Sequence, residues 1–429
     1  MLYCVANVRL RHENHHDHPK AGSDEGNLPG RWCVDAGRLK QAAQNLNTSD
    51  PAVARKGAGG FFFGITKARR SHEGTKGDNV SARNRVDVGI LGATGMVGQQ
   101  FIVQLANHPW FRIAWLGASE RSEGKKYRDL AWRLSVPRPP EVEDMTVEAA
   151  APGRAPRLMF SGLDSKVAGD IEKAFAGAGH FVVSNARNYR MEQFVPLLIP
   201  EVNPDHLKLI PLQQQAKNWK GAIVTNPNCA TIPLAMALAA VRRFEPSRVV
   251  ISTMQAVSGA GYPGVPSLDI LSNVVPFIDG EEEKIQSETQ KILGTLQTDR
   301  VVPHPMVVSA QATRVPVING HTETISVSFQ KKPQLEELVS AFRAFTGKPQ
   351  QHGCPSAPRQ PLMVMEEPNR PQPRIDVERE GGMAVFIGRV RPCPVFDYKF
   401  VALGHNTVRG AAGAAVLNAE LMLAEKLID

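Results

Sequence analysis

One cysteine, Cys229, occupies a position from which a thiol could act as a nucleophile. It lies in the run TNPNCAT, between an expected strand at Ala222 to Val224 and an apolar helix expected at Ile232 to Arg243. A thiol at a helix N-terminus gains thiolate character, because the helix dipole stabilises negative charge. A thiolate can attack an acyl group or an aldehyde and hold its carbonyl carbon covalently. A buried structural cysteine is the commoner case, but the preceding turn of small and polar residues favours a nucleophile.

An arginine and a histidine at the two ends of the run RVPVINGH could assist this thiol. We expect a strand at Val315 to Ile318, with Arg314 before it and His321 in the glycine-preceded turn after it. A histidine can serve as the base for a thiol, and an arginine can anchor a carboxylate with two hydrogen bonds. Gln255 follows another expected strand, Val249 to Met254, and could orient the substrate or the thiolate.

A glycine-rich turn, GATGMVG, follows an expected strand at Val86 to Leu91 and opens a helix expected at Met96 to Ala106. Glycines let the backbone approach a pyrophosphate, whose charge is met by the N–H groups of the helix N-terminus. A tight turn without a ligand is the alternative, because this glycine spacing is a weak motif by itself. The position between strand and helix favours a nucleotide site, with Gly92, Thr94, Gly95, Met96, Val97 and Gly98 as its residues.

The loop after the second expected strand, Arg112 to Leu116, should select the cofactor. Its residues Ser119, Arg121 and Ser122 can bind a 2′-phosphate through charge-assisted hydrogen bonds. Glu120 is of the type that binds the ribose hydroxyls of NAD, so NAD is the alternative. We predict NADP.

Strands alternate with helices from Arg85 onward, which predicts a mostly parallel, doubly wound α/β sheet of Rossmann type. Residues 133–157 and the proline-rich residues 348–374 are expected to form long loops. Further strands are expected at Phe181 to Val183, Thr324 to Phe329 and Met383 to Val390, and a helix at Val408 to Leu427.

Residues 1–84 differ from the rest of the chain, because they are polar, glycine-rich and without long apolar periodicity. We expect disorder there, or a start codon assigned too early. A metal site in the tract of His12, His15, His16 and His18 is the alternative to a solvated segment. Residues 1–85 contain 14 Lys and Arg against 8 Asp and Glu, so they carry six of the eight net positive charges. The charge therefore does not indicate nucleic-acid binding by the folded part.

The five cysteines are odd in number and widely spaced, with no Cys-x-x-Cys pair. This pattern indicates reduced thiols in a cytosolic enzyme, not a disulfide scaffold or a zinc site. The longest apolar run near a motif, Thr231 to Val241, is shorter than the ~20 residues of a membrane span. We predict a cytoplasmic protein with no membrane segment and no metal.

Several runs in the same order resemble the aspartate-semialdehyde dehydrogenase family, and most closely its archaeal and fungal branch. They are SNARNYR, PLLIPEVNPDHL, TNPNCAT, QAVSGAGYPG, IDGEEEKI and RVPVINGH, and the resemblance covers residues 86–429. It implies an NADP-binding domain at 85–228, completed by a C-terminal helix at 404–429. It also implies an α+β catalytic and dimerisation domain at 229–403, in a homodimer or homotetramer.

The same resemblance implies roles for individual residues. Cys229 would be the nucleophile and His321 the acid/base, with Gln255 positioning the acyl group. The substrate would be bound by Arg314 at the carboxylate, Glu281 at the amino group, Lys284 and Arg190 at the phosphate, and Asn228 beside Cys229. Asn406 would contact the nicotinamide side of NADP. Charge patterning alone gives Glu281 and Lys284 a different interpretation, a solvated helix face with one ion pair.

The implied activity is the phosphate-dependent interconversion of β-aspartyl phosphate and aspartate β-semialdehyde, a step toward lysine, threonine and methionine. Its partners would be a phosphorylated amino acid and inorganic phosphate. A CoA-thioester reductase such as malonyl-CoA reductase is the alternative enzyme, since it would use the same thiol with another leaving group. A non-catalytic NADP sensor is the alternative from another class, and an unreactive Cys229 would favour it.

Overall fold

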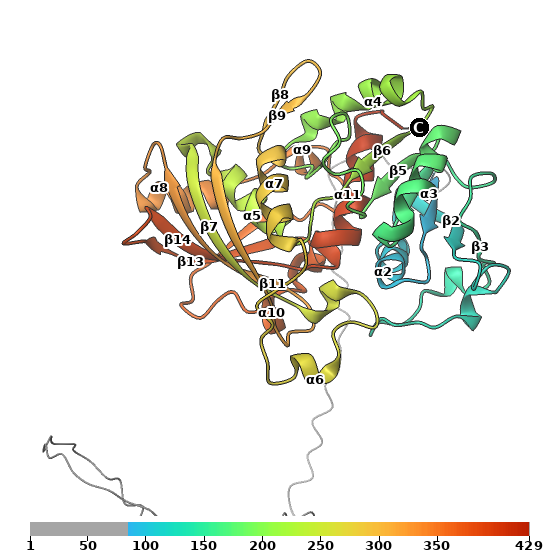
Figure 1. Ribbon diagram of the computed structural model, residues 1–429, viewed down its shortest axis with the longest axis horizontal. Helices are drawn as coiled ribbons and strands as arrows, with labels where there is room; N and C mark the ends of the chain where they lie inside the picture. Colours follow the sequence, from blue (N-terminus) through green and yellow to red (C-terminus); the bar gives the residue numbers. More distant parts are fainter. Residues whose placement is uncertain (1–84, 429) are drawn as a thin grey trace, which may run out of the picture. The chain divides into compact units, whose positions relative to one another are not determined.

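The computed structural model describes residues 85–428 and arranges them around two β-sheets (Figure 1). The disorder and the histidine tract that we expect before Arg85 lie outside the described residues. No helix within residues 85–428 combines the length and the apolar character that crossing a membrane requires.

The first sheet has six parallel strands in the order β3-β2-β1-β4-β5-β6. The chain order reverses between β1 and β4, and ligands of doubly wound sheets bind at such a reversal, outside the carboxyl ends of the strands. The predicted Rossmann-type fold is confirmed. The strands are β1 (Val86–Leu91), β2 (Phe111–Ala118), β3 (Glu148–Ala149), β4 (Leu158–Ser161), β5 (Phe181–Ser184) and β6 (Ala222–Thr225).

Four helices accompany this sheet: α2 (Met96–Leu105), α3 (Ser165–Ala178), α4 (Ile210–Lys217) and, from the end of the chain, α11 (Gly413–Ala424). Helix α3 shows how local sequence sets their ends. The Asp164 side chain accepts a hydrogen bond from the Lys166 N–H at its start, and Gly179, with φ +108°, ends it. Helix α11 is buried on nearly every side, and Val416 and Ala419 share one hydrophobic core with α2.

The second sheet is mixed, in the order β10-β7-β11-β14-β13-β12. Helices α5 (Thr231–Ala240), α7 (Glu281–Ile292) and α8 (Leu335–Ala344) share its hydrophobic core. Buried and exposed residues alternate along β7, so one face of the sheet is covered by these helices and the other is open. The strands are β7 (Pro246–Gln255), β10 (Val307–Arg314), β11 (His321–Phe329), β12 (Leu362–Met365), β13 (Val385–Pro392) and β14 (Tyr398–Gly404).

The remaining elements are short. A small hairpin joins β8 (Thr295–Leu296) to β9 (Val301–Val302), and one-turn helices are α6 (Ser267–Ile270), α9 (Lys348–Gln351) and α10 (Pro373–Asp376). The C-terminal helix is preceded by a π-helical turn at Val408–Ala412. The 3-10 turns are Tyr127–Asp129, Pro140–Val142, Pro204–Leu209, Arg242–Phe244, Val257–Ala260 and Arg379–Gly382.

The predicted strand at Val315 to Ile318 is wrong, because this segment is a loop between two strands. Strands β10 and β11 lie on either side of β7, so the chain between them must cross the end of β7. Pro316 has no N–H to donate to a ladder, and Gly320 has φ +98°. The loop crosses there with hydrogen bonds from Val257 N–H to Val317 O and from Val315 N–H to Gln255 O.

The predicted long loops were only partly right. Residues 348–374 include the edge strand β12 as well as α9 and the start of α10, and residues 133–157 include the two-residue strand β3. Strands this short give no measurable alternation in sequence, so these two edge strands, β3 and β12, were missed.

Candidate active site

The thiol of Cys229 faces the imidazole of His321. Cys229 lies in the turn between β6 and α5, and His321 is the first residue of β11. The Cys229 Sγ is 3.2 Å from the His321 Nε2, and the His321 Nδ1 is 3.1 Å from the Ala256 backbone nitrogen. The structure thus brings together two residues that are 92 positions apart in the chain.

The surroundings of this pair disfavour charge on either member. Desolvation raises the pKa of the Cys229 thiol, which is partly exposed, to about 12; Glu281 adds to the rise, and Arg190, Arg314 and Lys284 oppose it. Burial lowers the pKa of the His321 imidazole to about 3, and Arg314 lowers it further. These surroundings therefore oppose the thiolate character that a helix N-terminus favours.

Two glycines allow the pair to be enclosed. A Cβ on Gly410 would lie 2.6 Å from the Cβ of Cys229. A Cβ on Gly259 would lie 3.0 Å from Arg314 Nη1 and 3.1 Å from His321 Cε1. The Gly410 contact is shorter than real Cβ atoms allow, so this position requires glycine, whereas a side chain at Gly259 would displace its neighbours slightly.

Glu281 is the centre of a group of buried polar side chains. Its Oε1 accepts hydrogen bonds from Asn228 Nδ2 (2.7 Å) and Gln255 Nε2 (3.1 Å), and its Oε2 accepts one from Lys284 Nζ (2.7 Å). Burial would raise the pKa of Glu281, but the Lys284 ammonium and these hydrogen bonds more than offset it, so the pKa lies below its usual value. An ionised Glu281 is thus fixed beside the Cys229 turn.

Asn228 also stabilises the start of α5. Its side-chain Oδ1 accepts hydrogen bonds from the backbone N–H groups of Ala230 (2.8 Å) and Thr231 (3.2 Å). This satisfies two donors that the first turn of a helix leaves free. The position of Cys229 thus depends on the hydrogen bonds of Asn228 to the first turn of α5.

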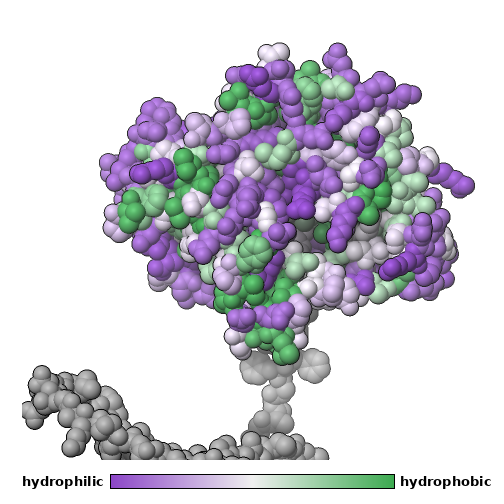
Figure 2. Space-filling view, viewed as in Figure 1, coloured by the Kyte–Doolittle hydropathy of each residue, from purple (hydrophilic) through white to green (hydrophobic). Residues whose placement is uncertain are grey.

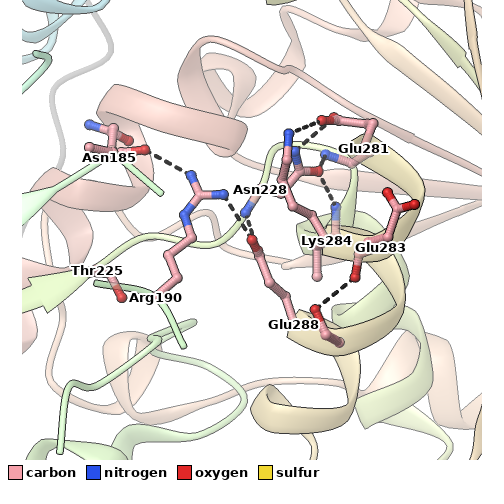
Figure 3. Close-up of polar contacts among 12 residues, drawn as sticks. Asn185, Arg190, Thr225, Asn228, Glu281, Glu283, Lys284 and Glu288 are labelled. Carbon is pink, nitrogen blue, oxygen red and sulfur yellow. Dashed lines mark hydrogen bonds and ion pairs between the residues drawn. The ribbon is translucent and has the colours of Figure 1, made fainter. Parts of the chain in front are cut away.

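Arg190 is paired with a carboxylate that the sequence did not single out. Its Nη1 donates to Glu288 Oε1 (2.9 Å) and its Nη2 to the Asn185 carbonyl (2.8 Å), as Figure 3 shows. The other oxygen of Glu288 accepts the Asn228 backbone N–H at 2.6 Å. Glu288 therefore links the guanidinium of Arg190 to the turn that carries the nucleophile.

One face of α7 supplies most of these charges. Glu281, Lys284, Glu288 and Lys291 follow each other at intervals of three, four and three residues, which places them on one side of a helix. Three of them are buried, so the interpretation as a solvated helix face is wrong. The spacing itself was the signal that could have identified Glu288 and Lys291.

Lys291 holds the segment that carries Arg190. Its Nζ donates to the carbonyls of Arg190 (2.6 Å), Glu192 (2.8 Å) and Val195 (3.0 Å). Burial lowers its pKa to about 8, although Glu288 and Glu192 oppose this. Three carbonyl partners fix both the ammonium and the loop.

Arg314 lies at the end of β10, beside Gln255 at the end of the parallel strand β7. Its Nη1 donates to the Ala256 carbonyl at 2.9 Å. Among the described residues, no carboxylate forms an ion pair with this largely buried guanidinium. Its charge is therefore available to an anionic group of a ligand.

The glycine turn after β1 has the geometry of a phosphate-binding turn. Gly92 has φ +75°, and a Cβ on Gly98 would lie 2.1 Å from the Gly92 carbonyl. The Gly95 N–H donates to the Gly92 carbonyl at 3.0 Å, and Met96 begins α2. Thr94 and Val97 lie within the same turn and are partly exposed. The turn lies at the reversal of strand order, where doubly wound sheets bind their ligands.

A pocket of about 460 Å³ lies beyond the end of β2. Ser119, Glu120 and Arg121 line one side of it, and Leu163, Val167 and Ile171 line the other. Arg121 and Ser119 on one side could bind a 2′-phosphate opposite the apolar wall, and Glu120 and Glu123 also line this side. Ser122 does not line this pocket. The apolar residues on the opposite side were not predicted, because only the folding of the chain brings them next to the loop after β2.

Asn406 connects three segments. Its Oδ1 accepts the Gly320 N–H (2.8 Å), and its Nδ2 donates to Ser258 Oγ (2.8 Å). It thus fixes the C-terminal segment against the loop before His321 and the loop after Gln255. Gly320 directly precedes His321, and Gly410, four residues after Asn406, lies against Cys229. Asn406 therefore lies near the pair of Cys229 and His321.

Glu323 is a buried carboxyl that no local pattern in the chain predicts. It lies two residues after His321, on the same face of β11, and neither of its oxygens has a hydrogen-bond partner among the described residues. Burial raises its pKa well above the usual value. The folded protein therefore holds Glu323 in its neutral form.

Replacing Glu323 with glutamine should stabilise the protein more at high pH than at low pH. As the pH rises, Glu323 ionises first in the unfolded chain, while the folded protein keeps its proton. The free energy of unfolding of the wild type therefore falls until the pH reaches the pKa of Glu323 in the folded protein. Each pKa unit of difference costs about 1.4 kcal/mol. We expect the increase in Tm that Glu323→Gln causes to be larger at about pH 8 than at about pH 5, by at least about 2 °C. Thermal denaturation at both pH values measures this, and an equal shift at both would contradict it.

A nucleotide-binding sheet and a buried thiol–imidazole pair, surrounded by cationic side chains, define a class of protein. It is a two-domain oxidoreductase that uses a nicotinamide cofactor and a cysteine. Comparisons with known proteins narrow this class. The NAD-binding domain model of semialdehyde dehydrogenases matches residues 87–210, and the dimerisation domain model of the same family matches residues 237–409.

The relatives are aspartate-semialdehyde dehydrogenases. The Archaeoglobus fulgidus protein is 48% identical over 346 residues, which cover 80% of this chain and 100% of the relative. The Saccharomyces cerevisiae protein is 45% identical over 358 residues, 79% of this chain and 98% of the relative. The crystal structure of the Candida albicans protein with NADP is 43% identical, covers 80% of this chain and 100% of that one, and has a TM-score of 0.75. The chain belongs to the aspartate-semialdehyde dehydrogenase family.

Proposed function

We propose that this protein interconverts β-aspartyl phosphate and aspartate β-semialdehyde, with NADPH as reductant, in the biosynthesis of lysine, threonine and methionine. The observation that carries the proposal is the pair of Cys229 and His321, 3.2 Å apart, with Arg314, Lys284 and Arg190 around it. These groups suit a substrate with a carboxylate, a phosphate and a reactive carbonyl between them. The activity named for the relatives supports this proposal.

Each polar group of the site has a part of the substrate to bind. Arg314 binds the α-carboxylate, and Glu281 binds the amino group. Lys284 and Arg190 bind the phosphate, at the cost of their present contacts with Glu281 and Glu288. Asn228 donates to the substrate beside Cys229. Because Lys284 and Arg190 are already paired with carboxylates, they are held in position until the substrate replaces these partners.

Cys229 is the nucleophile in this proposal. Its sulfur attacks the acyl carbon of β-aspartyl phosphate, phosphate leaves, and a thioester remains on the protein. Gln255 orients the acyl group, and His321 acts through Nε2 as the acid–base residue. The cofactor, when bound, supplies the reducing equivalent for the thioester.

The residues for NADP are those of the glycine turn and of the pocket after β2. Gly92, Thr94, Gly95, Met96, Val97 and Gly98 would hold the pyrophosphate, Ser119, Arg121 and Ser122 the 2′-phosphate, and Asn406 the nicotinamide side. The crowded approach of Gly98 to Gly92 supports the first assignment. The lining of the pocket supports the second for Ser119 and Arg121.

The decisive experiment compares substrates and cofactors. We expect reduction of NADP by aspartate semialdehyde to require phosphate, and NADPH to be oxidised by β-aspartyl phosphate but not by malonyl-CoA. The absorbance of the reduced cofactor follows both reactions. Turnover of malonyl-CoA without turnover of the aspartyl substrate would overturn the proposal in favour of a CoA-thioester reductase. Parallel assays with NAD measure the cofactor preference.

We propose that the folded chain divides into a nucleotide domain at 85–228, completed by 404–429, and a catalytic domain at 229–403. The membership of the two sheets and the position of α11 in the first core support this division. We also propose a cytoplasmic location, which the free thiols of Cys229, Cys354 and Cys393 support. Fractionation of cells tests it.

We propose that two copies associate through the apolar segment around α6, as a homodimer or as part of a homotetramer. This segment exposes Leu268 (90%), Leu271 (64%) and Phe277 (66%) to solvent, and Figure 2 shows the resulting hydrophobic patch at the lower edge of the molecule. Val275 pairs with Arg314, so the segment adjoins the β10 edge of the second sheet. An exposed patch of this kind marks an interaction site, and residues 237–409 match a dimerisation domain.

Replacing Leu268 with glutamate should dissociate the oligomer. The side chain is almost fully exposed, so a monomer would fold normally, whereas a buried charge in an interface is costly. Light scattering after size-exclusion chromatography should show a mass reduced to half or a quarter. Val136→Glu, on a partly exposed residue of the nucleotide domain, is the control and should leave the mass unchanged. An unchanged mass for Leu268→Glu would exclude this surface.

A further inference from the structure

Two buried polar side chains lie side by side on the face of the second sheet that the helices cover. Thr253 on β7 is paired with Glu323 on β11, and their exposed fractions are 1% and 0%. Neither the Thr253 hydroxyl nor either carboxyl oxygen of Glu323 has a hydrogen-bond partner among the described residues. Burying polar atoms without partners is costly, so such atoms in folded proteins are normally bonded to a water or to another group.

Gln255 adds another unpaired oxygen, at the end of the same face that adjoins the active site. It lies two residues after Thr253 on β7 and is also buried. Its Nε2 donates to Glu281 Oε1 at 3.1 Å, whereas its Oε1 has no partner in the part of the chain that the structure describes. Direct protein contacts therefore hold the Gln255 amide at only one of its two ends.

The neighbours of these polar groups in the sheet are apolar. Ala312 of β10 pairs with Thr253 on one side, and Ala402 of β14 pairs with Glu323 on the other. These alanines supply neither a polar atom nor a long side chain. The next inward-facing residues of β7 and β11 are isoleucines that belong to the hydrophobic core. The unpaired oxygens are thus collected at the active-site end of this face, and the core begins directly behind them.

One water molecule would satisfy this group of oxygens, because its donors and acceptors match theirs. Burial keeps Glu323 protonated, so its O–H can donate to the water. The water can then donate one hydrogen to Gln255 Oε1 and the other to Thr253 Oγ1. About three hydrogen bonds are usual for a buried water. An ionised Glu323 would instead compete with Gln255 for the hydrogens of the water, so the neutral carboxyl suits this role.

We propose that Glu323 and Thr253 bind an internal water, and that this water holds the Gln255 amide in place by donating a hydrogen bond to its Oε1. This rests on the proposed function for the role of Gln255, which orients the acyl group on Cys229. In that function the substrate amino group competes with Gln255 Nε2 for Glu281. The bond from the water to Oε1 then keeps the amide from rotating. Glu323 and Thr253 are thus positioning residues for Gln255.

A high-resolution crystal structure of the full-length protein tests the water directly. We expect one ordered water within hydrogen-bond distance of the Glu323 carboxyl, Thr253 Oγ1 and Gln255 Oε1. Thr253→Val replaces the hydroxyl with a methyl group of similar size, and we expect crystals of this variant to lack the water. A direct bond between Glu323 and Thr253, with no water between them, would overturn the proposal. This measurement involves no turnover, so its outcome does not depend on the proposed function.

Steady-state kinetics test the effect on Gln255. Glu323→Met keeps the length of the side chain but removes its hydrogen bonds, and we expect kcat for the semialdehyde to fall about ten- to hundredfold, with KM within about threefold. Glu323→Gln, whose amide can donate and accept, should keep kcat within about threefold of the wild type. Equal losses in both variants would refute the role of the water. The control Thr289→Val removes another fully buried, unpartnered hydroxyl, on α7, and should change kcat by less than about twofold.

A double-mutant cycle separates positioning of the amide from general damage to the fold. Gln255→Ala has no amide left to hold, so we expect Glu323→Met to change kcat by less than about twofold in this background. An equal loss with and without Gln255 would show that Glu323 acts by another route, and the proposal would fail. Thr253→Val gives the same comparison if Glu323→Met does not fold. A wild-type protein that contains the water but does not convert β-aspartyl phosphate would contradict the proposed function alone.

Discussion

Replacing Cys229 with serine is expected to reduce phosphate-dependent turnover of aspartate semialdehyde by about 10³-fold or more. A serine hydroxyl is a far weaker nucleophile than a thiol, and no other thiol is in reach of His321 among the described residues. The initial rate of NADP reduction measures the loss. Binding of NADP, followed by fluorescence, should be retained, because the glycine turn and the pocket after β2 lie on a different sheet from the second domain.

The control for this variant is Cys393→Ser. Cys393 lies in the turn between β13 and β14, and its thiol has no contact with the proposed catalytic residues. We expect its activity to match the wild type. If Cys229→Ser kept more than about a tenth of the activity with normal folding, the covalent mechanism would have to be abandoned.

Replacing Arg314 with lysine should lower kcat/KM for the aspartyl substrate by about 10²- to 10³-fold. Lysine keeps the positive charge but cannot bind a carboxylate with two parallel hydrogen bonds, nor keep the bond to the Ala256 carbonyl at the same time. Loss of a buried, charge-assisted contact of this kind costs about 2–5 kcal/mol. Steady-state kinetics with varied semialdehyde at saturating phosphate and NADP measure the effect.

The matched control is Arg248→Lys, on the exposed face of β7. It makes the same chemical change away from the site and should leave kcat/KM within about twofold of the wild type. Arg314→Met separates the contribution of the positive charge from that of the paired hydrogen bonds, because it removes both whereas Arg314→Lys keeps the charge. If Arg314→Lys and wild type bound the substrate equally, a carboxylate anchor at this position would be excluded.

The chemistry of the site could be predicted because its residues follow strand ends and helix starts. Cys229 and Gln255 were identified in this way, whereas Arg314 and His321 were placed at the two ends of an expected strand that is a loop. The structure brings all four together. Glu288 was not identified, although its spacing from Glu281 and Lys284 places it on the same face of α7. Its partners, Arg190 and Asn228, are 98 and 60 residues away.

The protonation state was also beyond the sequence. The dipole at a helix N-terminus stabilises a thiolate, but this stabilisation is small compared with the free-energy cost of removing a charge from water. The enclosure of Cys229, which leaves it partly exposed, depends on the approach of Gly410, from the segment before α11. Local arguments predict which residue reacts, whereas its resting charge depends on packing between distant segments.

The fold was predicted at the level of its first sheet and less well in its second. Helix α2 and the strands β1, β2, β5 and β6 have strong local patterns and were found within a few residues, whereas β3 and β4 were not predicted. Val315 to Ile318 was assigned to a strand because its residues are apolar and β-branched. The need to cross the end of β7 overrides that propensity, and strand order in a mixed sheet cannot be read from such a pattern.

The position of Gly410 against Cys229 has a consequence for protein synthesis. The nucleophile is translated well before the segment that encloses it, because Gly410 lies 181 positions after Cys229. The same segment continues into α11, which fills the core of the first sheet. A nascent chain therefore has neither a closed nucleotide domain nor a finished thiol pocket until this segment has been translated. Truncation by a late stop codon should yield an inactive, chaperone-dependent product, even though every proposed catalytic side chain has already been made.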